Sequence, residues 1–209
     1  MTPVIRFLVF ANVAVYGLQM VLGDTMFLHL ALWPVGTFPV EGGQLTVGFK
    51  PWQLVTSAFM HDPQSIAHIA LNMFALYMFG RDVELSMGSR RFAWLYGASI
   101  LAGSLAQLAV VTAQVDEIIV PTVGASGGVF GVLLAFAVLF PKRRVMLIFP
   151  PIPMPAWVLV TGYAVIELAS GVFGTQQGVA HFAHLGGMVG AAVVLLLASR
   201  RRPPRTRLG

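Results

Sequence analysis

The chain has 209 residues, of which 57% are hydrophobic and only 10% are charged, and its mean hydropathy is +0.80. A soluble domain carries about 25% charged residues, so this composition excludes a soluble protein and predicts a polytopic membrane protein with room for one domain. The net charge of +5 comes from short basic clusters between apolar runs, which argues against nucleic acid as a partner, and the lack of cysteine excludes disulfide and thiol chemistry.

Six apolar segments are expected to form the helices of an all-α membrane bundle. The connection 25–65 holds two shorter apolar pieces, 27–33 and 52–60, which are too short to span and are expected in the membrane interface. The start of the chain lacks the features of a cleaved signal peptide, so its apolar run is kept as a mature helix. The six segments are residues 4–22, 66–80, 92–113, 126–140, 155–173 and 182–199.

The fourth segment is too short to cross a membrane. About 15 residues at 1.5 Å each give about 22 Å, whereas the hydrocarbon core is about 30 Å thick. If Pro141-Lys142-Arg143-Arg144 anchors one end at an interface, Ser126 at the other end stops below the opposite surface. Non-helical backbone at that depth must be packed in protein or line a water-filled cavity. Residues 124–126 are therefore expected at the floor of a wet indentation.

Basic residues predict the orientation. With both termini in the cytoplasm, all but one of the 13 lysines and arginines lie inside, and Lys50 alone lies outside. The site at Ser126 then opens toward the outer face. Residues 1–200 are expected to form one membrane domain, and 201–209 a basic cytoplasmic tail that contacts anionic membrane lipids. The acidic residues of the outer loops are Asp24, Glu41, Asp62, Asp116 and Glu117.

Few polar side chains fall at membrane depth, where each is costly and is therefore a functional candidate. His68 and Asn72 share one face of the second helix at i, i+4 spacing. On the sixth helix, His184, Gly187 and Ala191 share a face, with Gly186 and Gly190 beside them as a Gly-x-x-x-Gly pair. The whole polar set is His68, Asn72, Ser126, Glu167, His181 and His184.

Small residues on the sixth helix allow close packing against Gly127 and Gly131 of the fourth, which would bring His184 beside Ser126. A serine next to an imidazole is the minimum for nucleophilic acyl transfer, because histidine can take the hydroxyl proton near neutral pH. Asn72, His68 and the Ser126 amide could bind the resulting oxyanion. No aspartate is placed to orient the base, so the sequence predicts a dyad and not a triad.

Alternative interpretations remain for these residues. The serine and glycines around Ser126 are also what close helix packing requires, and membrane histidines or Asn72 often serve as hydrogen bonders between helices. A metal site at His68, His181 and His184 is disfavoured because no Cys, Asp or Glu completes it and His-Glu-x-x-His is absent. Glu167 lies near the outer end of its helix, where we expect a structural contact with water or a backbone group.

Three motifs in order resemble those of the rhomboid family of intramembrane serine proteases. Gly124-Ala125-Ser126-Gly127 is similar to the family's Gly-x-Ser-Gly, His68-Ile69-Ala70-Leu71-Asn72 to its His-x-x-x-Asn, and Ala183-His184-Leu185-Gly186-Gly187 to its Ala-His-x-x-Gly. The stretch from Gly80 to Glu84, followed by Gly88, resembles the family's turn after the second helix, and His61 resembles a histidine that supports the first outer loop. The resemblance covers residues 4–200, in the minimal six-helix form.

The resemblance implies a role for each matching residue. Ser126 would be the nucleophile and His184 the general base, while His68, Asn72 and the Ser126 amide would line the oxyanion hole. Phe130 stands where the family has an aromatic that stacks on the catalytic imidazole, commonly tyrosine, and Trp52-Gln53 stands where Trp-Arg is frequent. His181 is not chosen as base, because His184 occupies the place where its motif would need glycine. Gly124, Gly127 and Gly187 are supporting motif residues.

The expected function is hydrolysis of a peptide bond in or near the transmembrane segment of a single-pass protein, with no metal or cofactor. By resemblance, small and helix-destabilising residues would surround the cut. The alternative is a non-catalytic relative that binds transmembrane segments for trafficking or quality control. A small-solute channel or transporter ranks lower, because no inverted repeat is visible. The compact basic core favours a bacterial inner membrane, and neither the substrate nor the oligomeric state follows from the sequence.

Overall fold

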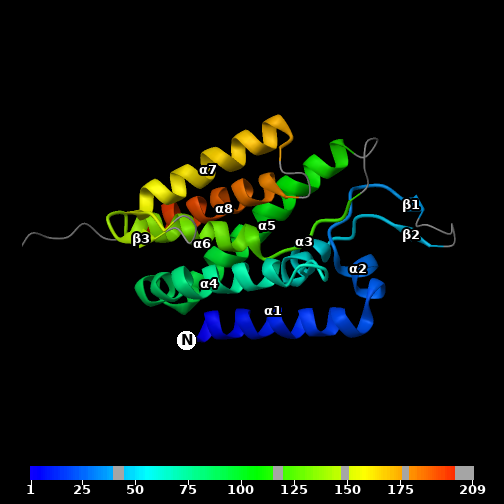
Figure 1. The fold of residues 1–209 in the computed structure, drawn as a ribbon, viewed down its shortest axis with the longest axis horizontal. Coiled ribbons are helices and arrows are strands. Elements are labelled where there is room, and N and C mark those ends of the chain that lie inside the picture. The colour runs from blue at the N-terminus through cyan, green and yellow to red at the C-terminus, as the bar shows by residue number, and fades with distance from the viewer. Residues whose placement is uncertain (40–44, 115–119, 147–150, 176–178, 201–209) are drawn as a thin grey trace, which may run out of the picture.

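The computed structural model describes residues 1–39, 45–114, 120–146, 151–175 and 179–200, and within them the chain is a helical bundle (Figure 1). The long helices are α1 (Pro3–Leu22), α4 (Ile66–Met87), α5 (Ser89–Ala113), α6 (Ser126–Leu139), α7 (Ala156–Phe173) and α8 (His181–Arg200). Each predicted apolar segment forms one of these helices, so the all-α membrane fold is confirmed. Glu41, Asp116, Glu117 and the tail 201–209 lie outside the described residues.

Short elements connect the long helices. The connection between α1 and α4 holds α2 (Asp24–Leu30), α3 (Gln53–Thr56), the 3-10 turn η1 (Ser57–Phe59), and the strands β1 (Phe38–Pro39) and β2 (Thr46–Val47), which pair antiparallel. At the other end, β3 (Arg144–Met146) pairs antiparallel with β4 (Pro153–Pro155). In Figure 1 the start of α1 and β3 lie at one end of the bundle, and β1 and β2 extend from the opposite end.

Four described helices, α1, α5, α7 and α8, are long and apolar enough to cross a membrane. α6 is apolar but has only 14 residues, in agreement with the prediction that the fourth segment is too short to cross a membrane. α4 has 22 residues and continues to Met87, beyond the predicted end at residue 80. The stretch Gly80–Glu84 is therefore helix and not the expected turn, and the chain reverses at Gly88, whose φ of 84° favours glycine. The protein is an integral membrane protein by these helices.

The charged end of α4 is helical because its carboxylates have partners there. Glu84 is buried and accepts hydrogen bonds from the hydroxyl of Thr2, the amides of Val4 and Ile5, and the hydroxyl of Ser89. It thereby satisfies amide groups at the start of α1 that have no partner within that helix. Asp82 pairs with Arg143 after α6. These contacts join α1, α4 and the end of α6 at one end of the bundle.

The connection between α1 and α4 is held by Gln53, which stands where the resembled family frequently has arginine. Its side chain is buried, and its Oε1 accepts the amides of Lys50 at 3.0 Å and Trp33 at 3.3 Å. Nearby, Gln19 of α1 exchanges two hydrogen bonds with the backbone of His61, at 2.8 and 3.0 Å. Gln53 therefore holds the connection together, and Gln19 fastens it to α1.

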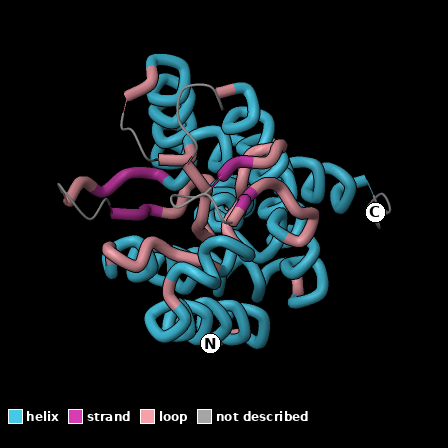
Figure 2. The backbone as a smooth tube through the Cα atoms, turned by 90° about the vertical axis from the view of Figure 1, so that its right-hand side faces the viewer, coloured by secondary structure: helices cyan, strands magenta, loops and turns pink. Residues whose placement is uncertain are grey.

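α6 lies against α4, α5, α7 and α8, which is why most of its residues are buried. Viewed along the bundle in Figure 2, the helices surround a central core, with the loops gathered at the end that faces the reader. α8 packs on α6 at Gly187, where an added Cβ would lie 2.0 Å from the carbonyl oxygen of Gly127. Gly186 and Gly190 face α5 instead, so this glycine pair serves a different neighbour from the one predicted.

Candidate active site

Ser126 is the first residue of α6, and the loop before it is fixed by the connection between α1 and α4. Leu32 and Thr122 exchange backbone hydrogen bonds at 3.0 and 2.9 Å, and the Gly124 amide donates to the Ser57 carbonyl at 3.0 Å. Gly124 has φ of 135°, a conformation that L side chains rarely adopt. The backbone N–H groups at the start of α6 have no partner within the helix and carry a partial positive charge.

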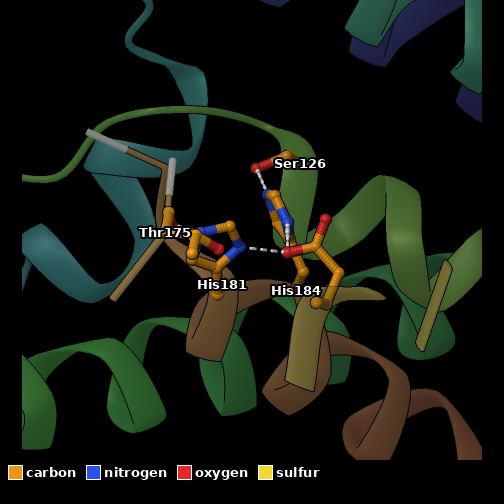
Figure 3. A network of polar contacts seen from close by, with 5 residues as sticks. Ser126, Thr175, His181 and His184 are labelled. Carbon is orange, nitrogen blue, oxygen red and sulfur yellow. Dashed lines mark hydrogen bonds and ion pairs between the residues drawn. The ribbon is translucent and has the colours of Figure 1, made fainter. Parts of the chain in front are cut away.

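His184 of α8 lies directly beside Ser126. The Ser126 hydroxyl oxygen is 2.8 Å from Nε2 of His184, within hydrogen-bond distance (Figure 3). The two residues are 58 positions apart in the chain, and the Gly127–Gly187 contact between α6 and α8 brings them together. This is the juxtaposition that the small-residue pattern predicted.

The ring of Phe130 stacks on the imidazole of His184, with 4.1 Å between centroids and 5° between planes. Phe130 is one turn after Ser126, so the same helix presents the serine and covers one face of the histidine. Tyr163 of α7 meets the Phe130 ring edge-on at 6.0 Å. The expected stacking is present, and it restricts rotation of the imidazole.

His68 points its Nε2 toward the backbone before Ser126: a Cβ on Gly124 would lie 3.0 Å from this atom. Its Nδ1 accepts the Asp62 amide at 3.2 Å, so a neutral His68 carries its proton on Nε2 and can donate it there. Asn72 donates one Nδ2 hydrogen to the His68 carbonyl at 2.9 Å, which leaves the second for another acceptor. Both side chains can therefore act as donors, and that of His68 lies close to the loop before the serine.

His61 lies behind His68, with 5.1 Å between ring centroids. Burial, reinforced by the neighbouring His68, lowers the pKa of His61 to about 4. The ring is therefore neutral at neutral pH and packs against His68 without adding a charge.

Glu167 contacts both histidines of α8, which contradicts its predicted contact with water or a backbone group. Its Oε2 is 2.7 Å from Nδ1 of His181 and 2.9 Å from Nδ1 of His184. The dashed lines in Figure 3 show the network that runs from Ser126 through His184 to this carboxylate and on to His181 and Thr175. This contact is not predicted from the sequence, although an acidic residue in one apolar segment and two histidines at the start of the next are a signal for it.

His181 does not take part in the contact with Ser126. Its Nε2 is 3.1 Å from the carbonyl oxygen of Thr175, and its Nδ1 is on Glu167. The direct nitrogen–oxygen distances of 2.7 and 2.9 Å leave no space for a metal ion between these side chains. Within the described ranges, no group of three His, Cys, Asp or Glu side chains is arranged to hold a metal.

A small cavity opens beside Ser126, with about 20 Å³ available to the centre of a water molecule. This is room for one or two waters by the usual minimum of about 10–15 Å³ each. Its lining includes the small residues Gly103, Gly127 and Ala183 and the polar residues Ser104 and Gln107. The space can hold a small group next to the hydroxyl.

The family model and the known proteins that match this chain agree with one another. Residues 48–201 match the model of the rhomboid domain. The chain is 37% identical over 134 residues to "Rhomboid protein 1, mitochondrial" of Saccharomyces cerevisiae, which covers 64% of this chain and 38% of that protein. It is 30% identical to "Rhomboid-like protein 16, chloroplastic" of Arabidopsis thaliana, over 89% of this chain and 59% of that protein. It is 31% identical to "Rhomboid protease GluP" of Bacillus subtilis, over 66% of this chain and 24% of that protein. The chain thus spans less than two thirds of the length of each.

Proposed function

The chain belongs to the rhomboid family, and on that premise we propose that it is an intramembrane serine endopeptidase. It hydrolyses peptide bonds in or near the transmembrane segments of single-pass membrane proteins. The relative from Bacillus subtilis is named a rhomboid protease, which supports this assignment. The observation that carries the proposal is the 2.8 Å contact between the Ser126 hydroxyl and Nε2 of His184 at the start of a buried helix.

The proposed reaction has two acyl-transfer steps. His184 Nε2 takes the proton of Ser126 Oγ while the oxygen attacks the carbonyl carbon of the substrate. The tetrahedral intermediate collapses to an ester on Ser126, and His184 passes its proton to the leaving amine. Water then attacks the ester and gives a proton to the same nitrogen, which returns it to Ser126 Oγ as the acid product leaves. Each proton transfer uses His184, so the scheme needs no cofactor or metal.

The negative oxygen of the intermediate needs hydrogen-bond donors that are in place beforehand. We assign this role to Nε2 of His68, to the free Nδ2 hydrogen of Asn72 and to the amide of Ser126. The orientation of His68 is supported by the Asp62 amide on its other nitrogen. Loss of one such donor costs roughly 10²–10³-fold in kcat in a serine protease.

The small residues that line the cavity favour a small side chain at the scissile bond. Gly103, Gly127 and Ala183 leave little space for a larger group. A substrate segment must also be extended at the cut, because a helical peptide bond is screened by its own turn; small, weakly helical residues make that extension less costly. These two features together favour single-pass proteins whose membrane segments are rich in such residues.

The bias of basic residues supports cytoplasmic termini and a site that opens to the outer face. In this orientation the cut releases the outer portion of the substrate. We assign the protein to a bacterial inner membrane, although the family includes relatives named for mitochondria and chloroplasts. The basic tail would contact anionic lipid on the inner face.

The test is cleavage of a single-pass membrane substrate in liposomes, together with labelling by a fluorophosphonate, which reacts with activated serines. We expect wild-type protein to cleave and to label on Ser126, and Ser126→Ala and His184→Ala each to lose about 10⁴-fold or more in kcat. The matched control is Ser99→Ala, which removes a buried hydroxyl bonded to the Leu95 carbonyl and should keep both activities.

Two results would contradict the proposal. If the folded wild type neither cleaves nor labels but binds the intact substrate, the chain is a non-catalytic binder of transmembrane segments. If His184→Ala cleaves and His181→Ala does not, the base has been assigned to the wrong histidine.

A further inference from the structure

Glu167 is a buried carboxylate that a serine–histidine dyad leaves without a role. It lies in the last two turns of α7 and is 8% exposed. Charged groups at such depth are costly and need partners. Within the described part of the chain, its partners at ion-pair distance are the two histidines of α8, and no lysine or arginine is among them. The carboxylate is therefore directed at the proposed base and its neighbour.

The protonation state that the proposed reaction requires of His184 puts its one N–H on the nitrogen that faces Glu167. Nε2 must be unprotonated in order to accept the proton of Ser126, and a neutral imidazole carries one N–H, so that hydrogen is on Nδ1. Nδ1 is 2.9 Å from Oε2 of Glu167. The alignment falls short of a regular hydrogen bond, as is common for catalytic contacts before substrate binds. When Nε2 takes the serine proton, the positive ring has a carboxylate at its opposite nitrogen.

The hydrogen bonds of His181 show how the Glu167 carboxylate is held in position. The Thr175 carbonyl can only accept, so Nε2 of His181 carries a hydrogen. Nδ1 lies 2.7 Å from Oε2 of Glu167, and a single proton joins these two atoms, either as an imidazolium–carboxylate pair or as a carboxyl group that donates to the ring. In both forms His181 fixes the position of Glu167 and reduces its negative charge.

From these contacts we infer that Glu167 is a positioning residue for His184, and that the site works as a Ser126–His184–Glu167 triad tuned by His181. The inference rests on the proposed protease function and changes the dyad that the family resemblance implies. Glu167 keeps the proton of resting His184 on Nδ1 and stabilises the ring after it takes the serine proton. It transfers no proton itself, as in the serine proteases that use an orienting aspartate.

The expected effect is smaller than in those proteases. Loss of the orienting carboxylate there costs roughly 10⁴-fold in kcat, because the histidine turns to the wrong tautomer. Here Phe130 also holds the ring of His184, by stacking, and His181 weakens the charge of Glu167. We therefore expect Glu167→Gln to lower kcat roughly 10²-fold. On a free-energy scale this is about half of the 10⁴-fold loss in those proteases.

The experiment compares Glu167→Gln with wild type and with Glu84→Gln, a matched change at a buried glutamate far from the site. Cleavage in liposomes is followed across pH, and fluorophosphonate labelling of Ser126 measures serine activation without a substrate. Thermal unfolding corrects each rate for the folded fraction. Besides Glu167, the titratable groups near His184 are His181 on α8 and His68 on α4, and both are unchanged in these variants.

For Glu167→Gln we expect kcat and the labelling rate to fall together while KM changes less than about twofold, because the effect lies in the transition state. The acidic limb of the rate profile should move to lower pH, since a ring without a carboxylate beside it gives up its proton more readily. Glu167→Asp keeps the charge and should restore part of kcat with the acidic limb near its wild-type position. Glu84→Gln should lose stability and leave the pH profile unmoved.

Three outcomes would overturn the inference. If wild type neither cleaves nor labels, the proposed function fails and the triad fails with it. If wild type is active and Glu167→Gln labels and cleaves within about threefold of it, the function stands and the positioning role is wrong. If Glu167→Gln loses activity only in proportion to lost folded protein, with its pH profile in place, Glu167 has a structural role alone.

Discussion

Two buried glutamates at opposite ends of the bundle differ in the groups that surround them. Glu84 and Glu167 are 2% and 8% exposed, so burial does not distinguish them. Glu84 receives four hydrogen bonds, divided between both of its oxygens, from hydroxyl and amide groups that do not titrate near neutral pH. Glu167 directs one oxygen at two imidazoles, which unlike hydroxyl and amide groups can take up a proton during the proposed reaction.

This difference separates a structural carboxylate from one that can respond to chemistry. A carboxylate surrounded by fixed donors stays ionised, and its energy changes little when a proton moves elsewhere. A carboxylate beside imidazoles interacts more strongly with them once they are charged, so its energy follows the protonation of the base. The groups that surround each glutamate therefore predict its role better than its residue type or its burial does.

Among substitutions that leave the proposed serine and base in place, the largest effect on kcat should come from separating the two helices that carry them. In Gly187→Ala the new Cβ would meet the Gly127 carbonyl at 2.0 Å, so α6 and α8 must move apart. We expect a loss of about 1–3 kcal/mol in the free energy of unfolding and at least roughly 10²-fold in kcat, because small misplacements of reacting groups are costly. Glu167 and His181 lie on α7 and α8, so their contact should survive.

Thermal unfolding and single-turnover cleavage measure these two effects, and Gly162→Ala is the control because its Cβ would meet nothing within 4 Å. Wild-type kcat in Gly187→Ala would show that this contact does not set the distance between Ser126 and His184.

The second prediction tests Glu84 as the structural member of the comparison. In Glu84→Gln the amide NH₂ would face donors that the carboxylate oxygens accepted, so hydrogen bonds to the start of α1 are lost. We expect the free energy of unfolding to fall by about 2–4 kcal/mol, with kcat per folded molecule unchanged. Glu167→Gln should change stability by less than about 1 kcal/mol, since its amide can still bond a neutral imidazole.

Denaturant or thermal unfolding in the same detergent measures both changes. Equal destabilisation by the two substitutions would remove the distinction between the carboxylates.

The smallest effect should come from His181, which shares Glu167 with the base. His181→Asn keeps an N–H donor near the position of Nδ1 and removes the imidazole that shares a proton with Glu167. The carboxylate then acts on His184 with its full charge, so the acidic limb of the rate profile should move to higher pH, opposite to the shift in Glu167→Gln. We expect kcat to stay within about threefold of wild type, because the base and nucleophile are untouched.

The pH dependence of labelling at Ser126 reports this shift directly. A shift to lower pH in His181→Asn would mean that His181 strengthens the effect of the Glu167 charge on His184 and does not reduce it.

Most of the helices and the proposed dyad could be predicted from the sequence, for local reasons. Long apolar runs must be helical in lipid, and the glycines around Ser126 and after His184 indicated close contact between the helices that carry them. The end of α4 could not be placed, because the charged stretch after Gly80 looked like a turn. It stays helical since Glu84 and Asp82 find partners on α1 and after α6.

The sequence by itself determined the membrane class, the helix order and the residues proposed for nucleophile, base and oxyanion donors, because hydrophobic runs and small-residue spacings act through near neighbours. Only the tertiary structure decided which glycines of α8 meet α6 and which meet α5, and that Glu167 faces both histidines. The physical reason is the short range of these contacts. A hydrogen bond or ion pair forms within about 3 Å, and the packing of α7 on α8 sets that distance, so no pattern within one helix reveals it.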